Sequence, residues 1–122
     1  MKEKLPERRR FIRAEIPLKV IVKCDGREDV VSVKNVSPVG VRFEIPQKLD
    51  EGKKLALSLY LPSVSDPISI DGKVAWQTKV SLEDVAPYDV GVEIINIKDR
   101  DKNTFLKYLC DLLYGSVFKE RT

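Results

Sequence analysis

The sequence predicts a mainly β fold, a small antiparallel six-stranded β-barrel with one α-helix at the C-terminus. Short runs rich in β-branched residues alternate with turns built from glycine, proline and aspartate, which is typical of antiparallel strands. Near residue 99 the apolar residues change to the spacing of an amphipathic helix. At 122 residues and 43% hydrophobic composition, the chain has the size of one domain with its own core.

The boundaries of the strands and of the helix follow from these patterns. The turn signal Asp25-Gly26 separates the first two strands. The expected strands are Ile16–Cys24, about Glu28–Asn35, Val41–Ile45, Leu55–Leu61, Ile68–Gln77 and Asp89–Asn96. The helix is expected over about residues 99–118, with Asp99 or Asp101 capping its start.

Positive charge is concentrated at the N-terminus. Residues 1–13 contain six basic and two acidic side chains, whereas the whole chain has a formal net charge of only +3. We therefore expect residues 1–13 to form a flexible basic arm and residues 14–122 to form the folded domain. A local basic cluster of this kind favours an anionic partner.

Four of the basic side chains in this arm are arginines, namely Arg8, Arg9, Arg10 and Arg13. Arginine presents a planar fork of donors that matches phosphate oxygens or the edge of guanine, and it also stacks on nucleobases. The arm could therefore close over a bound nucleotide. The alternative is a solvated basic tail, or a nonspecific contact with RNA, DNA or an acidic membrane surface.

A second motif, Asn35-Val-Ser-Pro-Val-Gly40, interrupts the strand pattern. The asparagine amide offers donor and acceptor groups and Ser37 adds a small hydroxyl, so the pair could read the edge of a base. Gly40 permits positive φ or a close approach of a ligand to the backbone. The alternative is an ordinary β-turn, in which asparagine, serine, proline and glycine are all common.

Together the two motifs resemble the PilZ domain family, whose pattern is Arg-x-x-x-Arg followed by Asp/Asn-x-Ser-x-x-Gly. Arg9–Arg13 and Asn35–Gly40 match both parts in the right order. Two later segments, 71–76 and 88–96, resemble later strands of the family, and the terminal helix is also where the family places one. The resemblance covers the chain over about residues 7–113.

The resemblance implies a receptor for cyclic di-GMP and a role for each matching residue. Arg9 and Arg13 would clasp the guanine edges and phosphates, with their guanidinium planes stacked on the bases. Asn35 would hydrogen-bond the guanine edge. Ser37 would contact a base or a phosphate, and Gly40 would let the loop approach the ligand.

Arg8 and Trp76 are two further candidates for the ligand site. In the family, an arginine directly before the Arg-x-x-x-Arg motif is associated with an intercalated ligand dimer, so Arg8 predicts two ligands per chain, whereas Arg10 occupies a variable position. Trp76 shares strand parity with Val74, which favours a core aromatic. The alternative is that Trp76 stacks against a ligand base.

Composition argues against several other classes of function. The chain has no histidine, and the spacing of Cys24 and Cys110 does not suit a metal, so neither a zinc site nor a histidine-assisted catalytic couple is expected. The start of the sequence is polar and unlike a secretory signal peptide, and no apolar run approaches the ~20 residues of a membrane span. We therefore expect a cytoplasmic protein with reduced thiols, no cofactor, no membrane insertion and no enzymatic activity.

The sequence thus predicts a binding module that converts the level of cyclic di-GMP into a conformational change. The ligand would order residues 7–13 against the barrel, and so create or mask a surface for an unidentified downstream effector protein. One alternative is a PilZ-fold adaptor that binds proteins but not the nucleotide. A nucleic-acid-binding role has only the charge of the arm in its favour, so no nucleic-acid partner is expected.

Overall fold

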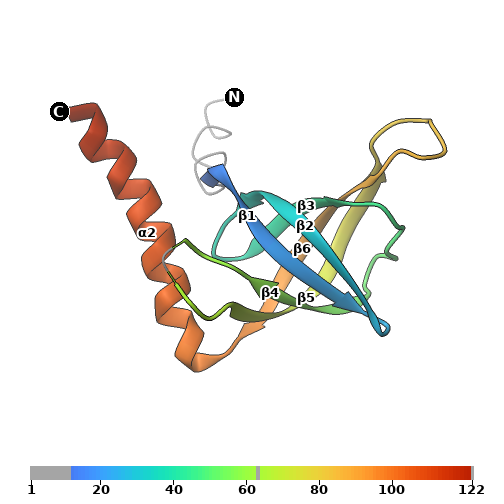
Figure 1. The fold of residues 1–122 in the computed structure, drawn as a ribbon, viewed down its shortest axis with the longest axis horizontal. Coiled ribbons are helices and arrows are strands. Elements are labelled where there is room, and N and C mark those ends of the chain that lie inside the picture. The colour runs from blue at the N-terminus through green and yellow to red at the C-terminus, as the bar shows by residue number, and fades with distance from the viewer. Residues whose placement is uncertain (1–11, 63, 122) are drawn as a thin grey trace.

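Six antiparallel strands close into a barrel, and a long C-terminal helix lies beside one end of it (Figure 1). The computed structural model describes the backbone of residues 12–62 and 64–121 and the side chains of residues 18–62 and 64–112. The elements are β1 (Ile12–Cys24), β2 (Arg27–Val36), β3 (Gly40–Ile45), β4 (Lys54–Leu59), β5 (Ile68–Lys79), β6 (Tyr88–Ile97) and helix α2 (Asp99–Arg121). The predicted fold class is confirmed.

The strands follow the order β1-β2-β3-β6-β5-β4 around the barrel, and β4 pairs with β1 to close it. Strands β1, β2 and β3 pair in sequence order as one meander, and β4, β5 and β6 pair in sequence order as a second. As a result β3 pairs with β6, with Gly40 opposite Glu93 and Ile45 opposite Tyr88. This pairing brings the loop at residues 37–39 beside β6, which is distant from it in the sequence.

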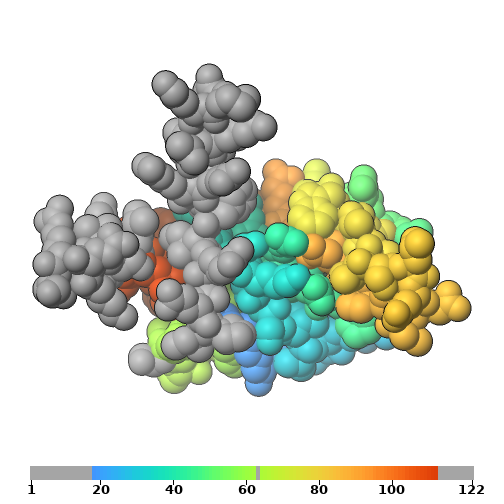
Figure 2. Space-filling model, turned by 90° about the horizontal axis from the view of Figure 1, so that it is seen from above, coloured from blue at the N-terminus to red at the C-terminus, as the bar shows by residue number. Residues whose placement is uncertain are grey.

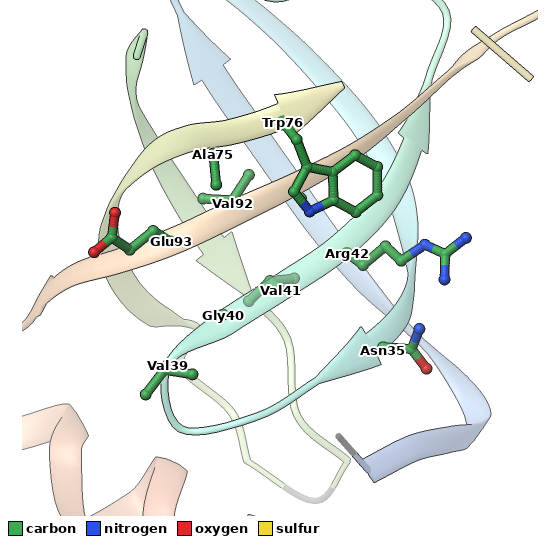
Figure 3. Close-up of a pocket in the computed structure, with 10 residues that line it drawn as sticks. Asn35, Val39, Gly40, Val41, Arg42, Ala75, Trp76, Val92 and Glu93 are labelled. Atoms are coloured by element: carbon green, nitrogen blue, oxygen red, sulfur yellow. The ribbon is translucent and has the colours of Figure 1, made fainter. Parts of the chain in front are cut away.

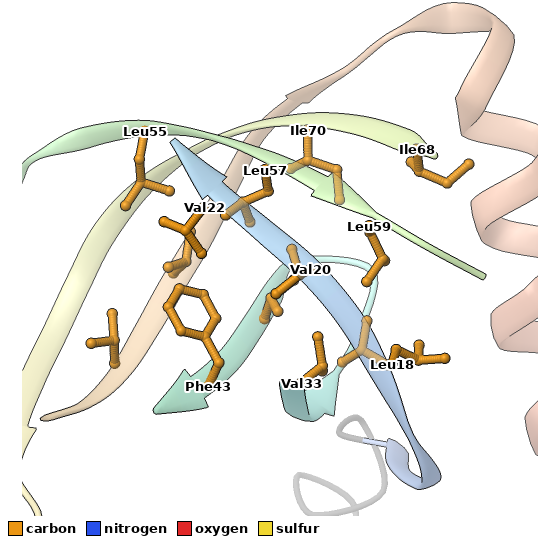
Figure 4. Close-up of a cluster of buried hydrophobic side chains, with 14 of the residues drawn as sticks. Leu18, Val20, Val22, Val33, Phe43, Leu55, Leu57, Leu59, Ile68 and Ile70 are labelled. Atoms are coloured by element: carbon orange, nitrogen blue, oxygen red, sulfur yellow. The ribbon is translucent and has the colours of Figure 1, made fainter. Parts of the chain in front are cut away.

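Alternate side chains of the strands fill the interior of the barrel. On β3, Val41, Phe43 and Ile45 are buried, while Arg42 and Glu44 between them are partly exposed. Phe43 has no exposed surface and lies within the cluster of aliphatic side chains drawn in Figure 4. Because side chains alternate along a strand with a period of two, one face of each strand is buried in the core and the other face is available for binding.

Helix α2 packs on the barrel through one stripe of its surface. Phe105 and Leu109 are buried, whereas Leu106 between them is exposed. Asp101 lies inside the first turn of the helix, where its carboxylate accepts a hydrogen bond from the backbone N–H of Ser69 at 3.0 Å. This acid therefore ties the helix to the start of β5, at the end of the barrel opposite the β5–β6 loop (Figure 1).

Strand β1 begins at Ile12, four residues before the expected start at Ile16. Its register with β2 shifts between Arg13 and Leu18. Pro17 lies in this interval, and proline has no N–H to donate to a neighbouring strand, so the ladder of hydrogen bonds is interrupted there. Pairing resumes on the N-terminal side of the shift, so Arg13 belongs to the barrel.

The described residues contain two free cysteines and no helix with the length and apolarity that a membrane span requires. Cys24 is buried on β1 and Cys110 is exposed on α2. Burial raises the pKa of the Cys24 thiol, and the nearby Asp25 carboxylate adds to this shift. The Cys24 thiol is therefore held in its neutral form, as an apolar core residue should be.

Candidate ligand-binding site

One row of residues crosses five neighbouring strands of the barrel. The backbone register places Arg13 opposite Asn35, Asn35 opposite Arg42, Arg42 opposite Gly91, and Gly91 opposite Trp76. Neighbouring strands lie about 4.8 Å apart, so this row is roughly 19 Å long. The last residue of the Arg-x-x-x-Arg motif and the first residue of the Asn-x-Ser-x-x-Gly motif are therefore direct neighbours on adjacent strands.

A bulge in β2 turns Asn35 to the outer side of the barrel. Val33 is opposite Phe43 and Asn35 is opposite Arg42, so β2 contains one more residue than β3 between these pairs, namely Lys34. Strict alternation would have directed Asn35 into the core with Val33. Because of the extra residue, Asn35 is partly exposed while both Val33 and Val36 remain buried.

A second bulge turns Trp76 outward. Val74 pairs with Val92 and Trp76 pairs with Gly91, so Ala75 is the additional residue on β5. The side chain of Val74 is 1% exposed, whereas Trp76 is 39% exposed. The expectation of a core tryptophan, which assumed unbroken alternation from Val74, is therefore wrong; the bulge reverses the parity of the strand at this point.

The indole of Trp76 lies directly on the backbone of Gly91. A Cβ atom at Gly91 would come within 2.2 Å of Nε1 and 2.3 Å of Cε2 of the indole, so only glycine allows this packing. The Arg42 guanidinium carbon lies 5.8 Å from the centroid of the Trp76 ring, within the range of a cation–π contact. Figure 3 shows the indole across β6, with Arg42 on β3 and Asn35 on β2 beyond it.

Asp89 on β6 fixes the position of Arg42. The Arg42 Nε donates to Asp89 Oδ1 at 3.0 Å, and its Nη2 donates to Oδ2 at 2.5 Å. These hydrogen bonds hold the pKa of Asp89 below its ordinary value and raise the pKa of Arg42. Within the described part of the chain no hydrogen bond uses the remaining guanidinium nitrogen, Nη1. Arg42 is thus held in a fixed orientation in the site, and its Nη1 group is free to donate to a ligand.

This ion pair predicts a pH-dependent effect on stability. Replacing Asp89 with asparagine should lower the free energy of unfolding by about 1 kcal/mol at neutral pH, a small value because solvent screens a pair in which Arg42 is 41% exposed. The pKa of Asp89 is lowered in the folded state, so the pair stabilises the fold above the unfolded pKa of about 3.8 and loses this contribution as the pH falls through the folded value.

Urea denaturation of both proteins across a pH series checks this expectation. The difference between wild type and Asp89→Asn should shrink steadily below about pH 4. Asp71→Asn changes an exposed carboxylate on β5 that lies outside this ion pair, and serves as the matched control. A difference of the same size under acidic and neutral conditions would contradict the assigned role of Asp89.

Ser37 organises the loop between β2 and β3. The residue is completely buried, and its hydroxyl accepts hydrogen bonds from the backbone N–H groups of Val39 at 3.2 Å and Gly40 at 3.1 Å. The Val39 carbonyl in turn accepts a hydrogen bond from the N–H of Ile94 on β6 at 2.9 Å. The spacing of the second motif therefore produces a tight loop anchored to β6, and a contact between Ser37 and the ligand stays a prediction.

Gly40 allows β3 to approach β6 closely. A Cβ atom at Gly40 would lie 3.0 Å from the carbonyl oxygen of Val92, a separation that side chains rarely adopt. A larger residue here would push the loop and the strand apart. The absence of a side chain at Gly40 thus already allows β3 and β6 to pack closely within the barrel. That it also lets the loop approach a ligand stays a prediction.

A pocket of about 590 Å³ follows the row from Asn35 to Trp76 (Figure 3). It is lined by residues 35, 39–42, 75–76 and 91–93, which include the predicted site residues Asn35, Gly40 and Trp76. Its charged lining residues are Arg42 and Glu93, and Arg42 is already paired with Asp89. An anionic ligand in this pocket would therefore depend on cations from elsewhere, and the backbone of Arg13, the last arginine of the arm, lies opposite Asn35.

The predicted site residues fall into three groups, one of which is Ser37 alone, buried in the loop and outside the pocket lining. Asn35, Gly40 and Trp76 line one pocket, and the backbone of Arg13 lies next to Asn35. Arg8 and Arg9 lie outside the described residues. The structure thus unites the described part of the first motif with the second motif on the surface of the barrel.

Sequence reasoning missed Arg42, Asp89 and Gly91. Arg42 was recognisable as an outward-facing position, since it lies between the apolar residues Val41 and Phe43. Its partner Asp89 was not, because the two residues are 47 positions apart and meet only through the pairing of β3 with β6. Gly91 acquires its role only when the bulge in β5 places an indole on it.

Comparison with solved structures identifies similar folds. The inhibitor of motility MotI/DgrA of Bacillus subtilis is 18% identical with a TM-score of 0.68, over 89% of this chain and 51% of that one. Apo MrkH of K. pneumonia is 19% identical with a TM-score of 0.74, over 88% of this chain and 51% of that one. The chain therefore spans about half the length of these two proteins.

A third structure, the PilZ domain of YcgR from Escherichia coli with c-di-GMP, is 13% identical with a TM-score of 0.65, over 92% of this chain and 95% of that one. No curated protein sequence matches the chain. The family model of the PilZ domain matches residues 7–110, which includes both motifs and all six strands. The chain belongs to the PilZ domain family.

Proposed function

We propose that the chain is a receptor for cyclic di-GMP, which binds along the row from Arg13 to Trp76. The observation that carries this proposal is the register that sets Arg13 opposite Asn35, because it joins the two motifs of the family into one surface. Membership of the PilZ family supports it. So do the c-di-GMP complexes of two proteins with similar folds, YcgR of Escherichia coli and PlzA of Borreliella burgdorferi.

The residues of the row suit the parts of this ligand. Cyclic di-GMP has two phosphates and two guanines, and charge-assisted bonds from Arg9 and Arg13 would hold the phosphates and guanine edges. The amide of Asn35 provides a donor and an acceptor for a guanine edge. The face of the Trp76 indole away from Gly91 offers a platform on which a base can stack.

Ligand binding would order the part of the arm that precedes Ile12 over the row. Strand β1 starts at Ile12, so the arm enters the barrel directly at the site. The excess positive charge of the chain lies in this arm, and the pocket itself is nearly balanced in charge. A bound dianion would therefore attract the arm, and the closed arm would form or mask a surface for a downstream effector protein. The proposed role is binding and signalling rather than catalysis.

Calorimetric titration of the purified protein with cyclic di-GMP tests the proposal directly. GTP, cyclic di-AMP and a short oligonucleotide serve as competing ligands. Saturable binding at micromolar cyclic di-GMP, absent with the other three, is the expected result. Two ligands per chain would support the role assigned to Arg8, and one would refute it. Absence of guanine-specific binding would overturn the proposal. The alternative function, an adaptor that binds proteins but not the nucleotide, would then be favoured.

Trp76 can be used in two ways to test the site, as a fluorescence probe of ligand binding and as a residue to replace. It is the only tryptophan of the chain, so a base stacked on it should change the intrinsic fluorescence. Loss of such a stack costs about 1–3 kcal/mol, so Trp76→Ala should weaken cyclic di-GMP binding roughly 5- to 150-fold. Gly91→Ala should also weaken binding, since the new Cβ forces the indole to move.

Tyr60→Ala is the matched control, because this partly buried aromatic lies outside the pocket, under Lys19. Its affinity for the ligand should equal that of the wild type. If Trp76→Ala also binds like the wild type, the indole forms no part of the site.

A further inference from the structure

The loop between β5 and β6, residues 80–87, exposes three large apolar side chains, Val80, Leu82 and Val85. Leu82 is 100% exposed and Val85 is 88% exposed, the two highest values among the large hydrophobic residues of the described chain. Fully exposed aliphatic side chains that lie close together are typical of interaction surfaces. In Figure 1 this loop extends beyond the barrel, at the end opposite α2.

Hydrogen bonds hold this loop in a defined shape. The N–H of Val80 donates to the carbonyl of Pro87 at 2.9 Å and closes the loop. The N–H of Ala86 donates to the carbonyl of Glu83 at 3.1 Å, and the Lys79 ammonium donates to the carbonyl of Asp84 at 3.3 Å. A partner would therefore meet a preorganised tip, which lowers the entropic cost of binding.

The tip is acidic as well as apolar. Glu83 and Asp84 lie between Leu82 and Val85, and residues 80–87 contain no basic residue. Neither carboxylate takes part in an ion pair with another described residue. A complementary surface should therefore combine an apolar hollow with an available cation.

Such a surface exists on the same molecule. A groove of about 690 Å³ is lined by Val30, Val31, Ile45, Pro46 and Pro87, with Lys19 and Lys34 among its polar residues. Lys34 is paired with Glu44 at 2.6 Å, whereas Lys19 lies 4.8 Å over the ring of Tyr60 and has no described carboxylate partner. The groove therefore offers exposed apolar surface, including Val30 at 65% exposure, together with one available ammonium group.

The groove begins where the loop ends. Pro87 closes the loop at its base and also lines the groove, so the loop projects from the edge of the groove. In Figure 2 the loop forms the right-hand edge of the molecule, beside the surface formed by β2 and β3. Two copies related by a twofold axis could thus each insert a tip into the groove of the other, as an isologous interface requires.

We propose that two copies of this chain dimerise by reciprocal insertion of Leu82 and Val85 into the groove around Val30, with the acidic tip facing Lys19. Four aliphatic side chains would leave water, and two sets of opposite charges would face one another. This contact does not involve the row from Arg13 to Trp76, so it is independent of the proposed nucleotide binding.

Analytical ultracentrifugation of the ligand-free chain over a concentration series tests this dimer. The average mass of the wild type should rise from that of one chain toward that of two. The double variant Leu82→Ser, Val85→Ser should dimerise at least about tenfold more weakly, as expected when central apolar anchors are removed. Its fold should be unchanged, because both side chains are exposed.

A charge-reversal pair identifies the two complementary surfaces. The double variant Glu83→Lys, Asp84→Lys and the variant Lys19→Glu should each dimerise poorly, whereas an equimolar mixture of the two should recover association. Leu106→Ser on α2 removes an exposed leucine far from the loop and should leave the dimer intact.

Three results with the wild type and with the tip and groove variants would overturn the proposal. They are a wild-type chain that stays monomeric at every concentration, a tip variant that dimerises like the wild type, and a mixture that associates no better than its components. Loss of the dimer in Leu106→Ser would also overturn it in favour of a helix-mediated contact.

Discussion

Replacing Arg13 with alanine is expected to weaken cyclic di-GMP binding by well over tenfold. The Arg13 backbone lies opposite Asn35, at the end of the row that we propose as the site. Each charge-assisted hydrogen bond to a phosphate or guanine contributes about 1.5–3 kcal/mol, and the fork of arginine makes two at a time. The described lining of the pocket has no excess of positive charge to replace what is lost.

Arg10→Ala is the matched control for Arg13→Ala. It removes the same charge from the same arm, at a position that the Arg-x-x-x-Arg pattern leaves open. Calorimetry should show a loss of affinity for Arg13→Ala, and for Arg9→Ala, that is several times larger than for Arg10→Ala. Equal losses for all three would mean that the arm acts only through its total charge, and the assigned clasp would be wrong.

Replacing Phe43 with alanine is expected to cause the largest loss of stability, about 3–5 kcal/mol, which is usual for truncating a buried phenylalanine. Phe43 has no exposed surface, and it pairs with Val90 on β6 and Val33 on β2. The cavity left behind would lie between the strands that hold Arg42 and Asp89. The variant should therefore also bind ligand more weakly wherever it is still folded.

Denaturant unfolding at low micromolar protein concentration measures the effect of Phe43→Ala. Leu106→Ala removes a comparable apolar group from an exposed position on α2, so its free energy of unfolding should stay within about 0.5 kcal/mol of the wild type. A loss below about 1 kcal/mol for Phe43→Ala would show that the barrel repacks around the missing ring.

Much of the fold could be predicted because it depends on local patterns. The alternation of Val41, Phe43 and Ile45 predicted a half-buried strand, and that strand is β3. The start of β1 was harder to predict, because the strand was expected from Ile16 whereas pairing with β2 extends it back to Ile12, past Pro17. A favourable partner strand compensates for one missing donor, and such compensation is not visible in a local window.

The site was predictable to a smaller extent. The two motifs identified Asn35, Gly40 and the arginines as candidates, but their spacing did not show that Arg13 and Asn35 are direct neighbours. Trp76 was expected in the core, because an extra residue in a strand cannot be recognised from alternation alone. The bulge at Ala75 turns it outward, onto a glycine of another strand.

The sequence by itself therefore determined the mainly β architecture, the basic arm and the two motifs, because periodicity, charge and short-range spacing are local properties of the chain. Only the tertiary structure decided that Arg13, Asn35, Arg42, Gly91 and Trp76 form one row. That row depends on the pairing of β3 with β6 and on two bulges. Hydrogen bonds between distant strands set these registers, so they exist only once the barrel has closed.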